Sequence, residues 1–232
     1  MRFERRSEYA AAMFALGLWG GLQAELRAAE ATHAKVSPVV IAVRYLDFRD
    51  PKTGKAISDA ESVNTMVNEV SEVWAQCQVG FRLEAYDAID PRQYGTGFSP
   101  VSFAELDHLR EATENKRYLT MIGTGAWNRS GNLGHSGSNC YSSFPRDAAD
   151  GIVCEAKVAK NPILHAHEAG HWLNLKHTND PASDGVADTT AQNSEHDLMN
   201  HFVAPGNRLL TPGQCQRARE AITEWRQNTS IR

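Results

Sequence analysis

The sequence lacks clustered basic residues and a membrane-length apolar run, and each absence excludes a class of protein. Its 24 lysine and arginine residues form no long run, and the formal net charge is −4. A nucleic-acid-binding surface needs a basic stripe, so we expect no nucleic-acid partner. No apolar run reaches the roughly 20 residues that span a bilayer, so we expect no stable membrane insertion. Internal repeats, glycine-rich phosphate loops and nucleophile elbows are also lacking.

The four cysteines, Cys77, Cys140, Cys154 and Cys215, include no CxxC pair. A zinc site with four thiolate ligands is therefore not expected. In an exported chain an even number of cysteines suggests two disulfides, for which three connectivities exist. The pair Cys140–Cys154 is favoured because these residues bracket a loop rich in glycine, serine and aspartate, and Cys77–Cys215 follows by elimination. In a cytosolic protein the four would be small buried side chains.

The first 24 residues have the pattern of a signal peptide. Arg2, Arg5 and Arg6 precede an uncharged stretch, 9–24, that ends in a small residue. This is the order of charged region, apolar region and cleavage site, so we predict a secreted protein with a periplasmic or extracellular location. Residues 25–35 are then a charged spacer, and 36–232 form the folded domain. The alternative is an amphipathic first helix of a cytosolic protein.

The rest of the chain is predicted to be one α+β domain. Its composition is ordinary, with 41% hydrophobic and 22% charged residues, and its length suits a single monomeric domain with two lobes. Apolar periodicity predicts strands at 38–48, 79–86, 117–123, 140–144 and 151–156. It predicts helices at 59–76, 101–115, 161–175 and 211–227. The opening β-α-β order is compatible with a sheet that carries helices on one face.

A histidine motif, HEAGHWLNLKH, occupies 167–177. His167 and His171 are four residues apart, so their imidazoles lie on one face of a helix. A catalytic zinc site needs three protein ligands and one open position. His177 can be the third ligand only if the chain turns after His171. Asn174 stands where that turn is required, and after glycine it is the residue most often found in a left-handed helix exit.

The motif is too specific to be explained well by ordinary surface histidines. With nine histidines in the chain, this arrangement arises by chance in about one such sequence in a thousand. Glu168 is adjacent to the first ligand and suits a general base that contacts the attacking water rather than the metal. His165 faces away from the ligand side of the helix, so we leave it out of the site.

The motif resembles the extended zinc signature of the metzincins, HExxHxxGxxH, with Asn174 in place of the glycine. Three later segments strengthen the resemblance. DGVADT at 184–189 is similar to the stretch after the third histidine in pappalysin-like (cytophagalysin-type) members. DLMNH at 197–201 is similar to the Met-turn, and LTPGQ at 210–214 to the segment that opens the last helix. The resemblance covers about residues 117–227.

The resemblance implies a zincin-like (metzincin) α+β fold. Its upper lobe, to about residue 177, has a mixed five-stranded sheet and two long helices, and a smaller lower lobe, 178–232, ends in a helix. Met199 would lie beneath the zinc ligands as an apolar floor, or else be an ordinary core residue. His201 stands where many relatives have a tyrosine that approaches the metal or the developing oxyanion. It is either a catalytic residue of the same kind or a surface residue.

The implied activity is that of a secreted zinc endopeptidase that acts on a protein or peptide. An extended substrate would pair with the edge strand near 140–144. The alternative is a catalytically idle metzincin-fold zinc protein that acts as a binding module, although Glu168 argues against it. Asp180, Asp184 and Asp188 are compatible with a calcium site, but a solvated acidic loop is slightly favoured.

Overall fold

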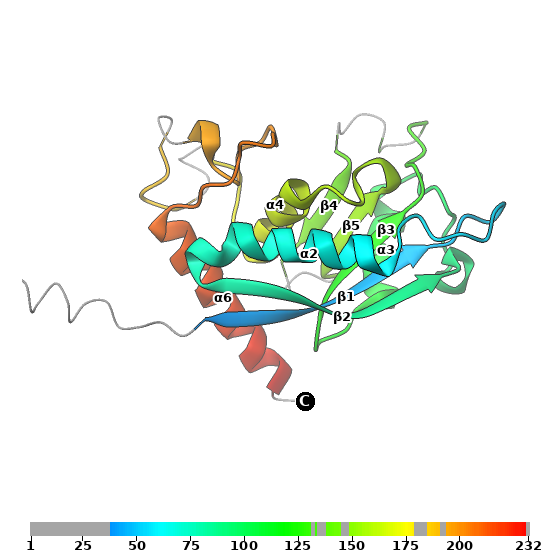
Figure 1. Ribbon diagram of the computed structural model, residues 1–232, viewed down its shortest axis with the longest axis horizontal. Helices are drawn as coiled ribbons and strands as arrows, with labels where there is room; N and C mark the ends of the chain where they lie inside the picture. Colours follow the sequence, from blue (N-terminus) through cyan, green and yellow to red (C-terminus); the bar gives the residue numbers. More distant parts are fainter. Residues whose placement is uncertain are drawn as a thin grey trace, which may run out of the picture. The chain divides into compact units, whose positions relative to one another are not determined.

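A mixed sheet forms the centre of the protein in its computed structural model (Figure 1). The structure describes residues 38–130, 133, 138–144, 149–178, 185–190 and 194–230. Within them the strands are β1 (Val39–Phe48), β2 (Val79–Ile89), β3 (Leu119–Thr124), β4 (Cys140–Ser143) and β5 (Gly151–Glu155). Their order is β2-β1-β3-β5-β4, and only the β4–β5 pair is antiparallel. The predicted five-stranded mixed sheet is therefore confirmed.

The described residues also contain four α-helices, close to the four predicted. These are α2 (Ala60–Trp74), α3 (Phe103–Thr113), α4 (Pro162–Trp172) and α6 (Pro212–Ser230). Short 3₁₀ segments are η1 (Ala75–Cys77), η2 (Pro91–Tyr94), η4 (Ala156–Val158) and η5 (Ser194–His196). Side-chain caps begin α2 and α4, because Asp59 accepts from Ser62 N and Asn161 accepts from Ile163 N. None of these helices is long and apolar enough to cross a membrane.

Helices cover both faces of the sheet, so the expectation of helices on one face is wrong for α3. Successive side chains of a strand point to opposite faces. Met121 of β3 accordingly lies in the core beneath α2 and α4, whereas Ile122 packs with Leu106 and Leu109 of α3. The apolar pattern of a helix identifies its buried side but does not say which face of a sheet it covers.

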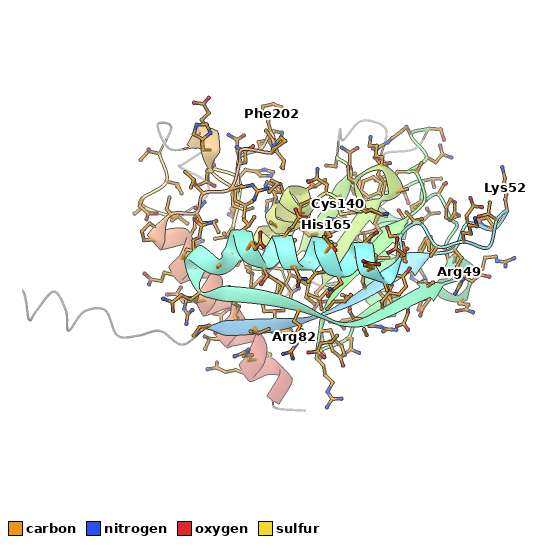
Figure 2. All side chains as sticks on the ribbon, in the orientation of Figure 1. Arg49, Lys52, Arg82, Cys140, His165 and Phe202 are labelled. Atoms are coloured by element: carbon orange, nitrogen blue, oxygen red, sulfur yellow. A yellow bond between two sulfur atoms is a disulfide. The ribbon has the colours of Figure 1, made fainter. Side chains whose placement is uncertain are left out.

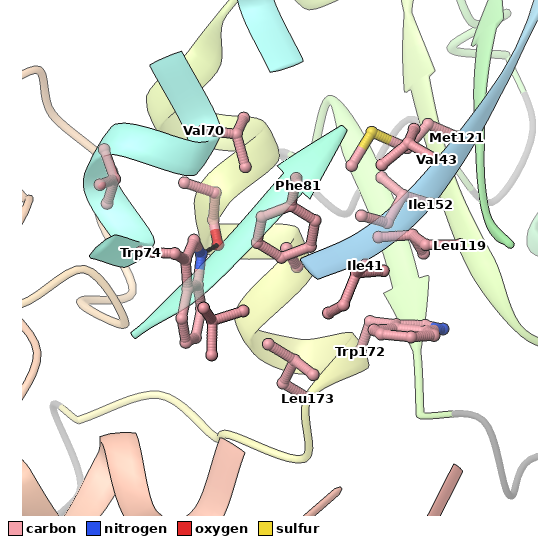
Figure 3. Packing of buried hydrophobic residues seen from close by; sticks show 14 of the residues in the cluster. Ile41, Val43, Val70, Trp74, Phe81, Leu119, Met121, Ile152, Trp172 and Leu173 are labelled. Carbon is pink, nitrogen blue, oxygen red and sulfur yellow. Dashed lines mark hydrogen bonds between the residues drawn. The ribbon is translucent and has the colours of Figure 1, made fainter. Parts of the chain in front are cut away.

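A tryptophan fixes the helix that carries the histidine motif. Trp74, at the end of α2, is fully buried and donates from its indole Nε1 to the carbonyl oxygen of Ala166 at 3.1 Å. Its ring meets Phe81 of β2 edge to face, with centroids 6.3 Å apart (Figure 3). Because this bond joins α2 to the middle of α4, the position of α4 over the sheet is determined by the core.

Both predicted disulfides are confirmed. Cys140–Cys154 joins β4 to β5 at directly paired positions. Cys77–Cys215 joins η1 to α6. The C-terminal helix is thereby linked to the first half of the domain. The division into an upper and a lower lobe stays a prediction, and the predicted signal peptide and spacer lie outside the described residues.

The two disulfides should differ in their contribution to stability. Cys77–Cys215 joins residues 138 positions apart, and Cys140–Cys154 joins residues 14 positions apart. The chain-entropy model of the unfolded state then gives stabilisations of about 5 and about 3 kcal/mol, respectively. We expect the Cys77→Ser/Cys215→Ser pair of substitutions to lower the free energy of unfolding more than Cys140→Ser/Cys154→Ser. Urea unfolding of the metal-free proteins measures both losses, and a larger loss for the second pair would contradict the loop-length explanation.

Candidate metal centre

Three histidine side chains converge at one point above the sheet. His167 and His171 lie one turn apart on α4, with ring centroids separated by 4.7 Å. The Nε2 atom of His177 is 3.3 Å from that of His167 and 3.1 Å from that of His171. One nitrogen of each residue lies within 4.8 Å of the others. The structure thus brings together the three residues that the sequence motif suggested as ligands.

The outer nitrogens of two of these rings are held by the backbone. His167 donates from Nδ1 to the carbonyl oxygen of Leu198 at 2.7 Å, and His171 donates from Nδ1 to that of Leu175 at 2.8 Å. A carbonyl oxygen only accepts, so Nδ1 carries the proton and the neutral ring keeps a lone pair on Nε2. Burial lowers the pKa of His167 to about 3 and that of His177 to about 4, which favours the neutral rings. Outer-nitrogen bonds of this kind are typical of metal-binding histidines.

The helix exit at Asn174 returns the chain to the histidines. Asn174 has φ 63°, which confirms the predicted left-handed turn. The helix ends at Trp172, three residues earlier than expected, and Leu175 N then bonds to the carbonyl oxygen of Gly170 at 2.9 Å. This turn presents the Leu175 carbonyl to His171 and allows His177 to come back to the first two rings. The left-handed conformation of Asn174 therefore helps to position both His171 and His177.

A methionine lies directly beneath the histidine helix. The side chain of Met199 is fully buried, and a Cβ added to Gly170 would lie 2.2 Å from its Sδ atom. The thioether therefore packs on the helix backbone at Gly170, between His167 and His171 in the chain. The backbone carbonyl oxygen of Met199 also accepts from the N–H of Thr178, the residue after His177, at 3.0 Å. The segment around Met199 thus supports both ends of the motif.

Glu168 lies in the wall of a cleft of about 840 Å³ that the three histidines also line. The residue is 7% exposed, and its Oε2 accepts from the hydroxyl of Ser142 on β4 at 2.6 Å. Burial raises the pKa of Glu168, while the nearby His171 and the Ser142 hydrogen bond oppose the shift. Glu168 is thus a buried carboxyl group that shares its cleft with the three histidines.

His201 reaches the site through His177. The Nδ1 atoms of the two rings are 3.3 Å apart, and the rings meet edge to face with centroids 4.7 Å apart. Its neighbour Phe202 is 77% exposed and projects outward from the ribbon (Figure 2). Both residues line the cleft. His165, in contrast, is fully buried and lies 6.5 Å from the ring of Tyr45, which agrees with its omission from the site.

The acidic residues after His177 are only partly described. Asp188 accepts from Thr211 Oγ1 at 2.6 Å and from Gly213 N at 2.8 Å, so it binds the start of α6 with both oxygens. Asp180 and Asp184 lie outside the described residues. The calcium site therefore stays a prediction, while Asp188 has an evident structural role.

Comparison with solved structures identifies the fold. A promirolysin mutant of Tannerella forsythia matches with a TM-score of 0.58 and 17% identity over 84% of this chain and 85% of that chain. The chain has a metzincin-like fold. A structure described as a chaperone–substrate complex matches with a TM-score of 0.54 and 13% identity, over 82% of this chain and 39% of that one.

Other comparisons add little to this metzincin-like fold. Metalloproteinase-II of Bacteroides fragilis has a TM-score of 0.48 and 14% identity, over 81% of this chain and 55% of that one. Neither a protein-family model nor a curated protein matches the chain. At these identities the likeness establishes the fold and leaves the activity to be argued from the site.

The sequence analysis missed two residues of this candidate site. Gly170 allows the close approach of Met199, and its signal was a glycine inside a helix, which costs about 1 kcal/mol relative to alanine and so indicates a packing reason. Ser142 contacts Glu168 from a strand 26 residues earlier. No local pattern around Ser142 identifies it, because its importance arises from a tertiary contact.

Replacing Asn174 tests the turn. We expect Asn174→Ala to lower the free energy of unfolding of the metal-free protein by about 1 kcal/mol, because alanine is strained in the left-handed region. Asn174→Gly should be close to neutral, since relief of strain is offset by the larger entropy of the unfolded chain. Urea unfolding gives both values, with the exposed neighbour Lys176→Ala as control. A loss for glycine as large as for alanine would contradict the role of the backbone conformation.

Proposed function

We propose that the protein is a secreted zinc-dependent endopeptidase, with His167, His171 and His177 as zinc ligands and Glu168 as the general base. One observation carries the proposal: three imidazole Nε2 atoms converge beside a buried carboxyl group. Two nitrogen ligands at 2.0–2.1 Å from a tetrahedral zinc lie about 3.3 Å apart. The observed separations of 3.3 and 3.1 Å from His177 fit that geometry.

The chemistry of the donors also fits zinc. His167 and His171 direct two lone pairs toward His177, an arrangement that is repulsive without a cation or proton between them. Three neutral imidazoles with an open fourth position are the ligand set of a catalytic zinc site rather than a structural one. When bound, zinc supplies Lewis acidity that polarises a carbonyl group and lowers the pKa of water toward about 7.

Glu168 performs the proton transfers in this proposal. Its carboxylate accepts a proton from the water that attacks the peptide carbonyl, and then delivers the proton to the leaving amine. Burial favours the protonated form of Glu168, so the carboxyl group can hold the proton between the two steps. The presence of this carboxyl group distinguishes the peptidase from an idle zinc-binding module.

The substrate is proposed to be an extended protein or peptide segment. β4 is the edge strand of the sheet and contributes Cys140–Ser143 to the cleft. An extended chain can add to such an edge through main-chain hydrogen bonds. This arrangement supports cleavage within a polypeptide.

Export is supported by the disulfides together with the N-terminal pattern. Two disulfides join the four cysteines, and such bonds persist in oxidising compartments. We therefore propose a periplasmic or extracellular location.

His201 is proposed to orient His177. If His177 presents Nε2 to the metal, its Nδ1 carries the proton and donates it to Nδ1 of His201, 3.3 Å away. The other two ligands use backbone carbonyls for this purpose, so His201 completes a set of three outer partners. The role in oxyanion stabilisation suggested by the resemblance stays a prediction.

Substitution of Glu168 tests the activity. We expect the zinc-loaded parent protein to cleave a mixture of denatured proteins, and Glu168→Gln to reduce kcat at least about 100-fold because the proton acceptor is lost. A chelator should abolish cleavage and added zinc restore it. Glu195→Gln removes an exposed carboxyl group elsewhere and serves as control. Parent and Glu168→Gln proteins that bind zinc equally but are both inactive would favour the binding module.

Metal affinity tests the role of His201. We expect His201→Ala to weaken zinc binding about 10-fold, because loss of an outer partner lowers affinity by that order. Competition with a chromophoric chelator measures the Kd. His196→Ala is the matched control, since His196 is an exposed histidine of the neighbouring η5 segment. If both variants bound zinc as tightly as the parent protein, His201 would have no orienting role.

A further inference from the structure

A hydroxyl group on the edge strand binds the carboxyl group assigned above as the general base. Ser142 Oγ donates to Glu168 Oε2 at 2.6 Å, between β4 and α4. We propose that Ser142 is a positioning residue for Glu168: it holds one carboxylate oxygen so that the other is presented to the attacking water. This inference rests on the proposed peptidase function and deepens it.

The pleat of β4 explains why Ser142 and not its neighbours reaches Glu168. Tyr141 and Ser143 point to the face covered by α3, where Arg110 lies 4.6 Å from the Tyr141 ring and bonds to the Ser143 hydroxyl. Alternate residues point to opposite faces. Cys140 therefore lies in the core beneath α4, and Ser142 faces the same helix.

Donor and acceptor are anchored independently. The Cys140–Cys154 disulfide ties β4 to β5 two residues before Ser142. The bond from Trp74 to the Ala166 carbonyl fixes α4 two residues before Glu168. Because neither anchor involves the Ser142–Glu168 contact, the hydroxyl meets the carboxyl group at a position set by the scaffold. Such rigid support is what a catalytic group needs to stay in its productive geometry.

The hydrogen bond from the Ser142 hydroxyl distinguishes the two carboxylate oxygens of Glu168. An ionised carboxylate only accepts, and the single hydroxyl proton of Ser142 is donated to Oε2. Oε1 is then the oxygen that accepts and releases the proton, while Oε2 remains bound in both steps. Without Ser142, a buried Oε2 loses its donor and the carboxyl group can rotate. Ser142 acts through Glu168, so its effect belongs to the proton-transfer steps and not to substrate binding.

Four variants separate this role from a structural one. Ser142→Ala removes the hydroxyl, and the isosteric pair Ser142→Thr and Ser142→Val differs only in that group, with both side chains suited to a strand. Ser62→Ala is the matched control, because it removes a bond of 2.8 Å from a serine hydroxyl on α2 to the carboxylate of Asp59, which caps that helix. We expect kcat to fall about tenfold in Ser142→Ala and Ser142→Val, with KM unchanged. Threonine should retain most of kcat, and Ser62→Ala should retain all of it.

The affinity for a small zinc-binding inhibitor tests the role of Ser142 even if the protein cleaves none of the substrates tried. Acetohydroxamate chelates zinc and hydrogen-bonds to a carboxylate beside it, so its Kd for the zinc-loaded proteins reports on Glu168 without turnover. We expect the Kd to rise about tenfold in the alanine and valine variants but not in the threonine variant. Zinc affinity should be unchanged in all of them, because the described bond of Ser142 is to Glu168 and not to a histidine.

The outcomes are distinct. A parent protein that cleaves nothing, combined with this order of acetohydroxamate affinities, would refute the peptidase while showing that the Ser142 hydroxyl orients the Glu168 carboxyl group. Threonine and valine variants with equal kcat and equal acetohydroxamate Kd would overturn the positioning role, whatever their thermal stability. A rise in KM with unchanged kcat would overturn it as well, because it would place Ser142 in substrate binding.

Discussion

The hydrogen bonds on the outer nitrogens of the histidines are the interactions on which the rest of the site depends. They hold His167 through the Leu198 carbonyl and His171 through the Leu175 carbonyl. The position of each carbonyl depends on the residue next to it. Leu175 follows the left-handed turn at Asn174, and Leu198 precedes the buried Met199. A hydrogen bond to the outer proton fixes the tautomer and the orientation of an imidazole. The turn at Asn174 and the methionine loop (residues 197–201) are therefore part of the proposed metal site.

The scaffold around these bonds is fixed from several directions. α4 is joined to α2 by the Trp74 indole, and α6 is joined to η1 by the Cys77–Cys215 disulfide. The methionine loop is held by Asp197, which is buried and accepts from Met199 N at 2.7 Å and from Gln214 on α6 at 3.0 Å. The C-terminal helix therefore supports the floor of the site, although it contributes no ligand to it.

On the cleft side of the site, side chains rather than backbone carbonyls contact the residues of the histidine motif. There the groups come from the edge strand β4 and from the exposed segment after Met199, which contribute Ser142 and His201. Ser142 forms a side-chain hydrogen bond to the carboxyl group of Glu168, and His201 forms one to the imidazole of His177. The backbone thus orients two of the proposed ligands, His167 and His171. Side chains orient the third proposed ligand and the proposed base, so these two groups are the most open to change by substitution.

The sequence by itself determined the parts of this protein that depend on local spacing. The interval of four between His167 and His171, the turn at Asn174 and the periodic apolar residues of the helices are consequences of helix geometry, and local geometry can be read from a single chain. Only the tertiary structure decided that α3 covers the opposite face, that Leu198 orients His167 and that Ser142 meets Glu168. These contacts join segments far apart in the chain, and their positions follow from packing of the whole core rather than from any pattern in the segments themselves.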